Sequence, residues 1–404
     1  MIETLRHTIL TRIRAGFDWG FECFARRTRV LFVVTDGYGF ACQSPVIRIL
    51  QTFPDVLVGV TTDKPDADKL IEFANPEDRA LFHALHLPYQ RARWRKWHML
   101  VNTHMNGFYP VFNVLRIQMH HGPGFGILGN KTGPIKQCDI FCGLLDAEYD
   151  WFERYQPGLF NERRLFIPVG FPKSDALDRR VFDRFDRRAV LNRLGLADRP
   201  TLLITSHWQQ PSILRTLGDA PLRTLAQAFP DYNIIQTGHP WLWQLNHNVP
   251  ADWQAAFMGA MHDIEARHPH ARFVQTSDVE TLLAVADLMV GDYSSVMTSY
   301  SLLDRPIVYF DSPGFEYTFA GLKDIFIGAS HPFSQPDELV PACQAALSGP
   351  QTKAEGRAHM RRTFYANEGR SAENMAELIR KIGRVSTTGS ADWARFVSTH
   401  GHPA

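Results

Sequence analysis

The sequence predicts an α/β protein with two Rossmann-like, doubly wound domains and an amphipathic helix at its start. Short apolar runs alternate with longer amphipathic segments along most of the 404 residues, a pattern typical of parallel sheets with helical crossovers. Between residues 171 and 199, Asp and Arg are frequent and apolar residues form no strand-like run. Because 404 residues exceed one ordinary core, we expect a linker at 171–199 between domains at 29–170 and 200–384.

Residues 1–28 predict an amphipathic, basic helix. Apolar residues recur there at steps of three or four while arginines fill the other faces. Such a helix either packs on its own protein or lies at the surface of a membrane that carries anionic lipid, and the pattern leaves both open. Basic and aromatic residues at 91–98 also favour peripheral contact with the inner face of the cell membrane.

The composition narrows the class of protein. Lys plus Arg (43) nearly equals Asp plus Glu (42), so no overall positive field points to nucleic acid. Five scattered cysteines do not form a disulfide framework and suit a reducing cytosol. No run of 18 apolar residues and no signal peptide is visible. We therefore expect a cytoplasmic protein without a nucleic-acid partner.

The first domain is expected to begin with a strand at 30–34 and a turn at Thr35–Phe40. A helix follows through 45–50, and further strands are expected at 56–60, 114–119, 139–144 and 165–169. The turn carries only Gly37 and Gly39, so it lacks the dinucleotide-binding fingerprint.

The second domain is expected to alternate in the same way. Its predicted strands are 201–205, 232–236, 272–275, 288–290 and 307–310, and its predicted helices include 214–229, 241–267, 337–347, 353–366 and 372–382. The residues that remain, 385–404, form a tail that we expect to return to the first domain.

The turn after residues 288–290 has the character of a phosphate-binding loop. Ser294 and Ser295 follow Asp292 and Tyr293 at the point where a strand gives way to a helix. Two hydroxyls and unpaired backbone N–H groups at the positive end of a helix dipole favour a phosphate. The alternative is that Ser294 only caps the helix.

Polar residues follow several other strands at their predicted carboxyl ends. They are His120–Gly124, Ser206–Trp208, Gly238–Pro240 and Ser277-Asp278. Ligands of doubly wound sheets bind at these ends, and two such domains in tandem place a cleft between them. The sequence therefore predicts one cleft lined from both domains.

Two histidines suit chemistry in such a cleft. Neutral His121 can accept a proton from an attacking hydroxyl, and charged His239 can steady phosphate oxygens. For each, the alternative is a structural histidine in a turn, and for His120 and His207 the structural role is favoured. The spacing lacks a metal motif such as His-Glu-x-x-His, so we expect no metal ion and no other cofactor.

The order of these motifs resembles the CDP-glycerol glycerophosphotransferase family, the teichoic-acid and capsule polymer synthases. The matching segments are His121-Gly122, Gly170–Asp175, Gly238–Pro240, Ser277-Asp278, and Asp292–Ser295 followed by Arg305-Pro306. The Asp-Tyr-Ser-Ser segment is the most specific of them. The resemblance implies a GT-B-like fold, in which the second domain holds the nucleotide and the acceptor approaches from the first.

The resemblance also implies roles for single residues. His121 would be the catalytic base, His239 would contact the donor phosphate, and Ser294 and Ser295 would hold the pyrophosphate. The residues implied on the donor side are Tyr293, Asp292, Gly238, Ser277, Asp278 and Ser206. Those implied on the acceptor side of the cleft are Gly122, Pro123, Gly124, Lys131, Lys173 and Asp175.

The chain departs from the family pattern at three places. Pro123 and Gly124 follow the His-Gly pair where the family has Thr-Pro-Leu-Lys-Lys, and the first lysine is Lys131. The segment 206–209 lacks the arginine of the family motif, and Ser299 stands where the family usually has an acid. These changes concern donor and acceptor contacts, whereas the predicted phosphate turn is retained.

The predicted function is inverting, in-line transfer of a glycerol-phosphate-type group from a CDP-activated donor. The acceptor would be a hydroxyl of a lipid-linked or polymeric cell-surface glycan. One alternative is a GT-B glycosyltransferase with a nucleotide-sugar donor, which would release a nucleoside diphosphate in place of CMP. Another is a non-catalytic binder of polyanionic glycan.

Overall fold

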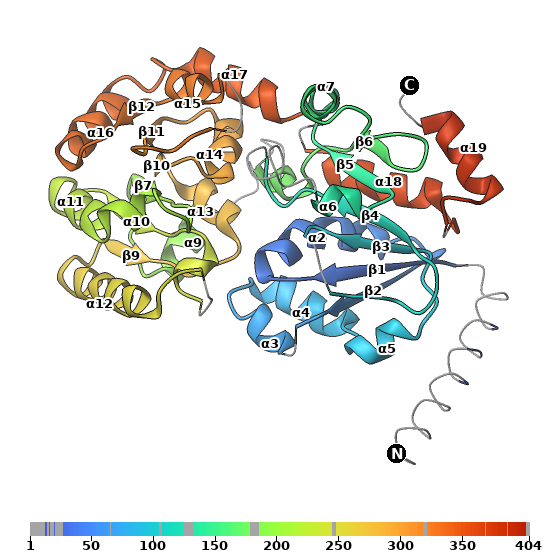
Figure 1. Ribbon diagram of the computed structural model, residues 1–404. Coiled ribbons are helices and arrows are strands. Elements are labelled where there is room, and N and C mark those ends of the chain that lie inside the picture. Colours follow the sequence, from blue (N-terminus) through green and yellow to red (C-terminus); the bar gives the residue numbers. More distant parts are fainter. Residues whose placement is uncertain are drawn as a thin grey trace. The chain divides into compact units, whose positions relative to one another are not determined.

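The computed structural model describes most of the chain. The described residues are 13, 16, 20, 27–64, 66–104, 107–123, 133–177, 186–244, 248–317, 321–367, 369–385 and 387–400. Almost all of the predicted N-terminal helix lies outside these residues, as do Gly124 and Lys131. Figure 1 shows the elements of the fold.

The chain divides into two compact units. Unit 1 comprises Met1–His121, Ile127–Lys173 and Ala366–Ala404, and unit 2 comprises Ser174–Tyr365 with Gly122–Gly126. These bounds differ from the expected ones in two ways. The segment predicted as a linker belongs mostly to unit 2, and the chain returns to unit 1 at Ala366, before the predicted tail at 385.

Within its described residues, unit 1 has a six-stranded parallel sheet in the order β2-β1-β3-β4-β5-β6. The strands are β1 (Thr28–Val34), β2 (Val56–Thr62), β3 (Met99–Asn102), β4 (Leu115–Met119), β5 (Ile140–Gly143) and β6 (Leu165–Pro168). Their side chains are mostly buried, as expected where helices cover both faces of a parallel sheet.

The helices of unit 1 are α2 (Gly37–Leu50), α3 (Ala67–Leu70), α4 (Pro76–Leu85), α5 (Tyr89–Arg93), α6 (Gly133–Lys136), α7 (Asp146–Tyr155), α18 (Ser371–Ile382) and α19 (Ala391–His400). Helix α2 begins earlier than predicted because Asp36 caps it: the carboxylate accepts a hydrogen bond from the Gly39 amide at 2.6 Å. Pro45 lies inside this helix.

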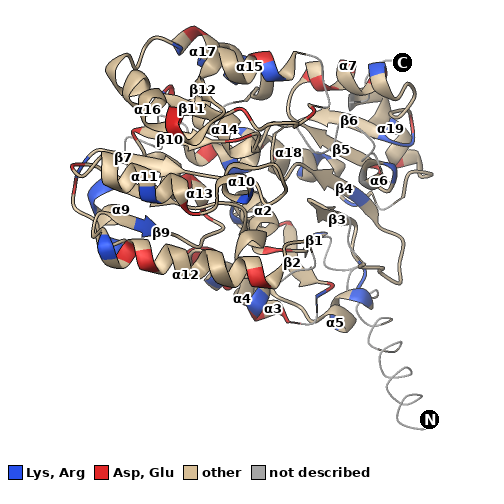
Figure 2. Cartoon of the chain, turned by 60° about the vertical axis from the view of Figure 1, so that its left-hand side comes forward, with Lys and Arg blue, Asp and Glu red and all other residues tan. Residues whose placement is uncertain are grey.

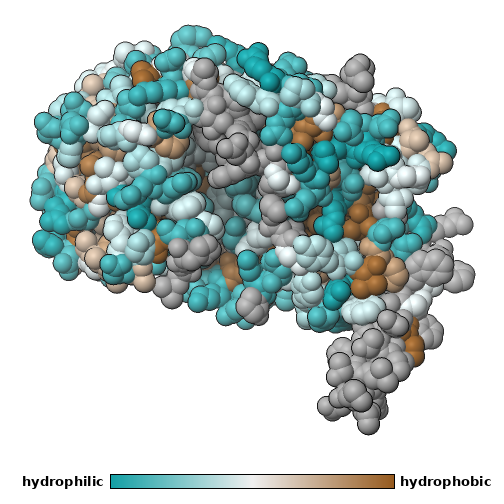
Figure 3. All heavy atoms as spheres, viewed as in Figure 1, coloured by the Kyte–Doolittle hydropathy of each residue, from teal (hydrophilic) through white to brown (hydrophobic). Residues whose placement is uncertain are grey.

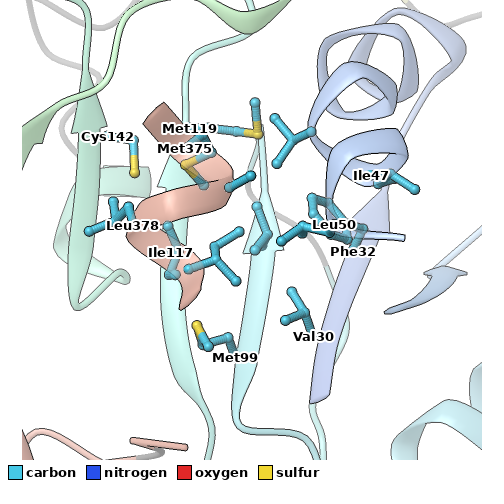
Figure 4. Packing of buried hydrophobic residues seen from close by; sticks show 14 of the residues in the cluster. Val30, Phe32, Ile47, Leu50, Met99, Ile117, Met119, Cys142, Met375 and Leu378 are labelled. Atoms are coloured by element: carbon cyan, nitrogen blue, oxygen red, sulfur yellow. The ribbon is translucent and has the colours of Figure 1, made fainter. Parts of the chain in front are cut away.

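Helix α18 belongs to unit 1, although the sequence placed it in the second domain. Its apolar face contributes Met375 and Leu378 to the core that also contains Ile47 of α2 and Ile117 of β4, and Figure 4 shows these side chains together. Trp393 of α19 is buried in the same core. Sequence order suggested the wrong boundary because a strongly amphipathic helix fits the core of either domain.

Unit 2 has, among its described residues, a second six-stranded parallel sheet in the order β12-β11-β10-β7-β8-β9. The strands are β7 (Thr201–Ile204), β8 (Asn233–Gln236), β9 (Ala271–Phe273), β10 (Leu288–Gly291), β11 (Ile307–Phe310) and β12 (His331–Phe333). This is the strand order of a Rossmann sheet.

The helices of unit 2 are α9 (Arg187–Arg193), α10 (Ile213–Leu217), α11 (Ala220–Ala228), α12 (Ala251–Arg267), α13 (Val279–Val285), α14 (Ser295–Tyr300), α15 (Leu322–Ala329), α16 (Leu339–Ser348) and α17 (Ala354–Phe364), with 3-10 turns η1 (Pro172–Leu177), η2 (Pro240–Leu242), η3 (Ser301–Leu303) and η4 (Pro336–Glu338). Two predicted helices are shorter than expected. The one at 214–229 is interrupted by Gly218, which has a φ of 60°, and the one at 241–267 begins only after Pro250.

The predicted fold class is confirmed. Ten predicted strands are present with small shifts at their ends, and β3 and β12 were missed. The miss at β3 has a consequence for residues 91–98, which were expected to form a basic, aromatic face. Trp97 and His98 precede β3 directly and are 2% and 3% exposed, so this segment presents no continuous aromatic surface.

The surface carries both signs of charge on helices of both units (Figure 2). The face drawn in Figure 3 is mostly hydrophilic, with small separate hydrophobic areas. Among the described residues, no helix combines the length and the apolar character needed to cross a membrane.

The chain leaves unit 1 after Lys173 and re-enters it at Ala366, and these two passages meet at Gly170 in unit 1. Gly170 has a φ of +90°, and a Cβ there would lie 2.3 Å from Oγ of Ser371 and 3.3 Å from the carbonyl oxygen of Ala366. The left-handed backbone and the close contact both require glycine. The first passage therefore packs directly beside the second.

We expect Gly170→Ala to lower the unfolding free energy by more than about 2 kcal/mol, because left-handed strain adds to overpacking. Gly158→Ala is the matched control: Gly158 has a φ of +74° but no atom within 4 Å of a Cβ, so strain alone should cost about 1 kcal/mol. Urea titration measures both variants. Equal losses would show that the contact with Ser371 contributes nothing.

Candidate functional site

Each sheet has a switch point, where consecutive crossovers leave in opposite directions and a ligand crevice opens at the carboxyl ends of the strands. In unit 2 this point lies between β7 and β10, and in unit 1 between β1 and β3. The predicted donor residues Ser206 and Asp292–Ser295 follow β7 and β10 directly. The structure therefore brings them together at the switch point of unit 2.

Asp292 is the centre of this group. Its side chain is fully buried. It accepts hydrogen bonds from Oγ of Ser206 at 2.9 Å and from the amides of His207, Ile213 and Ser294 at 3.0–3.1 Å. Burial raises the pKa of the carboxyl group to about 6, and these hydrogen bonds counteract the shift. Asp292 thus holds the loop after β7 against the turn after β10, and its oxygens face the protein's own donors.

The two serines of the turn differ. Ser294 is 8% exposed, and its hydroxyl accepts a hydrogen bond from the Val296 amide at 3.3 Å, which makes it the N-cap of α14. Ser295 is half-buried at the first position of the helix. The capping alternative thus applies to Ser294, while Ser295 is the more exposed residue of the two.

His239 lies at the carboxyl end of β8, next to the loop after β7. Its amide donates to the carbonyl oxygen of Ser206 at 2.9 Å, and its Nδ1 accepts a hydrogen bond from the Trp241 amide at 3.2 Å. A neutral histidine whose Nδ1 accepts must carry its proton on Nε2. Nε2 of His239 is therefore a hydrogen-bond donor even at neutral pH, which suits a phosphate oxygen and does not suit a general base.

Gly238 allows the loops after β7 and β8 to pack closely. A Cβ at Gly238 would lie 2.6 Å from Cδ1 of Leu242 and 3.0 Å from the carbonyl oxygen of Ser206. Its predicted place at the site is therefore that of a spacer between backbones, which keeps His239 beside the loop after β7.

Aromatic side chains surround the unit 2 group. The ring of Trp208 lies 4.7 Å from that of Trp241 and 6.2 Å from that of His239, and His207 lies 5.3 Å from Tyr293, centroid to centroid. Tyr293 is stacked on Phe315 at 3.7 Å, and its hydroxyl donates to the carbonyl oxygen of Gln209 at 2.7 Å. Tyr293 is thus a brace for the loop after β7.

Two other residues singled out in unit 2 have local roles. Asp278 caps α13 and accepts a hydrogen bond from the hydroxyl of Thr281 at 2.7 Å, and the preceding Ser277 is buried. Ser299, which replaces the family's acid, is 4% exposed, and its hydroxyl lies 2.8 Å from the hydroxyl of Tyr365. Tyr365 is the last residue of unit 2 before the second passage. The substitution at 299 therefore bears on that passage of the chain.

In unit 1, polar residues gather in the same way at the ends of β1, β3 and β4. His121 follows β4, and its ring lies 3.9 Å from the ring of His104, which follows β3. Nδ1 of His104 lies 3.0 Å from Oγ1 of Thr103 and 3.4 Å from Oγ1 of Thr35, the residue after β1. His104 was not recognised in the sequence because β3 was missed, and a strand-end position was the signal used for the other residues.

His120 is a structural residue, as the sequence favoured. It is 1% exposed, and its Nε2 lies 2.9 Å from a carboxylate oxygen of Glu148, which also accepts from the Leu144 amide at 2.7 Å. This pair joins the end of β4 to the start of α7. It holds the backbone that carries His121.

The residues predicted for the acceptor side are dispersed. Lys173 is 4% exposed, and its ammonium lies 4.7 Å above the ring of Tyr38 in unit 1. Asp175 is half-buried in η1 and belongs to unit 2, as do Gly122 and the buried Pro123. A Cβ at Gly122 would lie 2.6 Å from Oγ of Ser295, so the glycine of the His-Gly pair allows a close approach. Gly124 and Lys131 lie outside the described residues.

Within the described ranges, no group of three or more His, Cys, Asp or Glu side chains is arranged to hold a metal ion.

Solved structures share the fold. A variant of the wall teichoic acid polymerase TagF soaked with CDPG is similar at a TM-score of 0.65 and 16% identity, over 94% of this chain and 96% of that one. TagF itself gives 0.61 and 18% over the same shares. UDP-N-acetylglucosamine 2-epimerase gives 0.52 and 10%, over 87% and 95%. These likenesses define the fold as GT-B-like.

The family is shown by the sequence. The family model described as CDP-Glycerol:Poly(glycerophosphate) glycerophosphotransferase matches residues 152–381. Because the match spans more than half of the chain, this protein belongs to that family. It is a transferase that uses CDP-glycerol, which confirms the resemblance and the enzyme class predicted from the motifs. No curated protein matches the sequence.

The buried carboxylate of Asp292 gives a testable pH dependence. Because its folded pKa of about 6 lies above the ordinary 3.8, the folded protein binds the proton first between these values. The contribution of Asp292 to the unfolding free energy therefore rises, by up to roughly 3 kcal/mol, as the pH falls from 7.5 to 4. Urea titrations of wild type and Asp292→Asn at several pH values measure this difference. Parallel curves for the two proteins would contradict the assignment.

Proposed function

We propose that this transferase moves the glycerol-phosphate group of CDP-glycerol to a hydroxyl of a lipid-linked or polymeric cell-surface glycan, with His121 as the base. The observation that carries the donor half of the proposal is the tautomer of His239. Its Nε2–H is fixed as a donor by the Trp241 amide. His239 adjoins the loop after β7, which Asp292 joins to the serine turn that the family resemblance assigns to the pyrophosphate.

The proposed reaction is an in-line displacement at the phosphorus that bears glycerol. His121 accepts the proton of the acceptor hydroxyl as its oxygen attacks this phosphorus, and the bond to the bridging oxygen breaks. CMP leaves with the electron pair of that bond. Negative charge grows on the phosphate oxygens, where the Ser295 hydroxyl, its amide and Nε2–H of His239 would lower its energy.

Asp292 and Tyr293 support this chemistry by holding the serine turn and the loop after β7 in place. A buried carboxylate with a raised pKa lowers the free energy of unfolding. Its hydrogen bonds with three backbone amides and one hydroxyl nevertheless hold the turn in place. Donors that are already oriented need no rearrangement when the transition-state charge appears. In this proposal neither residue touches the substrate.

Variants of the two units should affect different steps. We expect His121→Ala to lower CMP release by at least about a hundredfold while the Kd for CDP-glycerol stays within twofold. The double variant Ser294→Ala with Ser295→Ala should weaken CDP-glycerol binding, measured by calorimetry. His262→Ala, an exposed histidine of α12, is the control and should match wild type.

Three results would contradict this proposal. An active His121→Ala enzyme would show that His121 is not the base. Unchanged CDP-glycerol affinity in the double serine variant would remove the serine turn from donor binding. Release of a nucleoside diphosphate in place of CMP would support the glycosyltransferase alternative.

We propose in addition that residues 1–28 attach the enzyme to the inner face of the cell membrane, where a lipid-linked acceptor would be within reach. The support is the basic, amphipathic pattern of the sequence. Flotation with vesicles that contain anionic phospholipid should recover the intact chain and recover less of a chain that starts at Arg29. Equal flotation of the two would contradict the proposal.

A further inference from the structure

We propose that His104 is a positioning residue for His121, which it holds by stacking ring against ring at the switch point of unit 1. The inference rests on the proposed role of His121 as the base. It adds a residue that the sequence motifs do not contain.

The close ring contact is the first observation. The two imidazole centroids are 3.9 Å apart with the planes 35° from parallel, which is a tilted contact in which each ring covers part of the other. Both side chains are half-buried. A ring whose face is covered in this way keeps a restricted set of side-chain torsions, because rotation would have to displace its neighbour.

The second observation is that His104 is itself fixed from two strands. Nδ1 lies 3.0 Å from Oγ1 of Thr103 and 3.4 Å from Oγ1 of Thr35, and the carbonyl oxygen of His104 accepts from Nδ2 of Asn102 at 2.8 Å. These partners come from the ends of β1 and β3, the strands on either side of the switch point. Because these contacts hold His104 in place, His104 in turn restricts the position of the His121 ring that it covers.

The backbone around this pair leaves no room for a bulkier arrangement. A Cβ on Gly39, in the first turn of α2, would lie 2.8 Å from Oγ1 of Thr103 and 3.7 Å from Nδ1 of His104. On the other side, Sγ of Cys42 lies 3.7 Å from the carbonyl oxygen of His121 as a donor. The main chain of His121 is thus held by α2 and β4, and its side chain is held by His104.

This arrangement suits a group that must accept a proton in one direction. A general base works only within hydrogen-bond reach of the attacking hydroxyl, so a wandering ring would lose rate without losing donor affinity. His104 would then affect the chemical step and leave the binding of CDP-glycerol unchanged.

The test compares His104→Phe, which keeps a ring face, with His104→Leu, which keeps comparable bulk without a ring. We expect Leu to lower kcat on the order of tenfold or more. Phe, which keeps a ring but loses the Nδ1 contacts with Thr103 and Thr35, should lower kcat clearly less than Leu, and the KM for CDP-glycerol should stay within twofold for both. CMP release gives both constants, and thermal unfolding shows whether each variant folds. A purely structural role would lower kcat and stability together in both variants.

Several results would overturn the inference. Equal kcat losses in Phe and Leu would show that the ring face is not the cause, and a Leu variant within twofold of wild type would show that His104 is not needed. His121→Ala, measured in parallel, separates the two proposals. If His121→Ala is inactive while His104→Leu is normal, only the role of His104 fails, whereas an active His121→Ala removes the proposed base and the inference with it.

Discussion

The serine turn of unit 2 depends on one buried carboxylate. Asp292 accepts hydrogen bonds from one hydroxyl and three backbone amides, and these donors come from two loops that are far apart in the sequence. An unpaired carboxylate would not stay ionised in a fully buried position, because removing it from water costs several kcal/mol. The loops after β7 and β10 must therefore remain together for Asp292 to be accommodated, and the loop after β7 also accepts a hydrogen bond from the His239 amide.

In unit 1, imidazole rings and threonine hydroxyls hold the ends of neighbouring strands together. Thr35, Thr103 and His104 meet across the switch point of its sheet, and His121 lies against them. A parallel sheet imposes this convergence on both units, since all strands deliver their carboxyl ends to one edge. The difference lies in what the convergence holds: a serine turn in unit 2 and a pair of imidazole rings in unit 1.

Histidine chemistry in this protein is decided by hydrogen bonds that the sequence does not show. His239 and His121 both follow a strand, and sequence reasoning separated them by the domain in which each lies and by the family resemblance. The Trp241 amide donates to Nδ1 of His239, so His239 is a donor at Nε2. His120, in contrast, is buried and paired with Glu148. The departure at Ser299, which the sequence suggested was a change in substrate contacts, proves to be a buried contact with Tyr365.

The sequence by itself determined the fold class, ten of the twelve strands found among the described residues and the family. Strand and turn patterns are local, and motifs such as Asp292–Ser295 are contiguous. Only the tertiary structure decided that α18 belongs to unit 1, because its apolar face fits either core until packing against α2 selects one. It also decided that Asp292 faces inward and that His104 covers His121, because both contacts join strands whose neighbours are set by sheet order and not by sequence order.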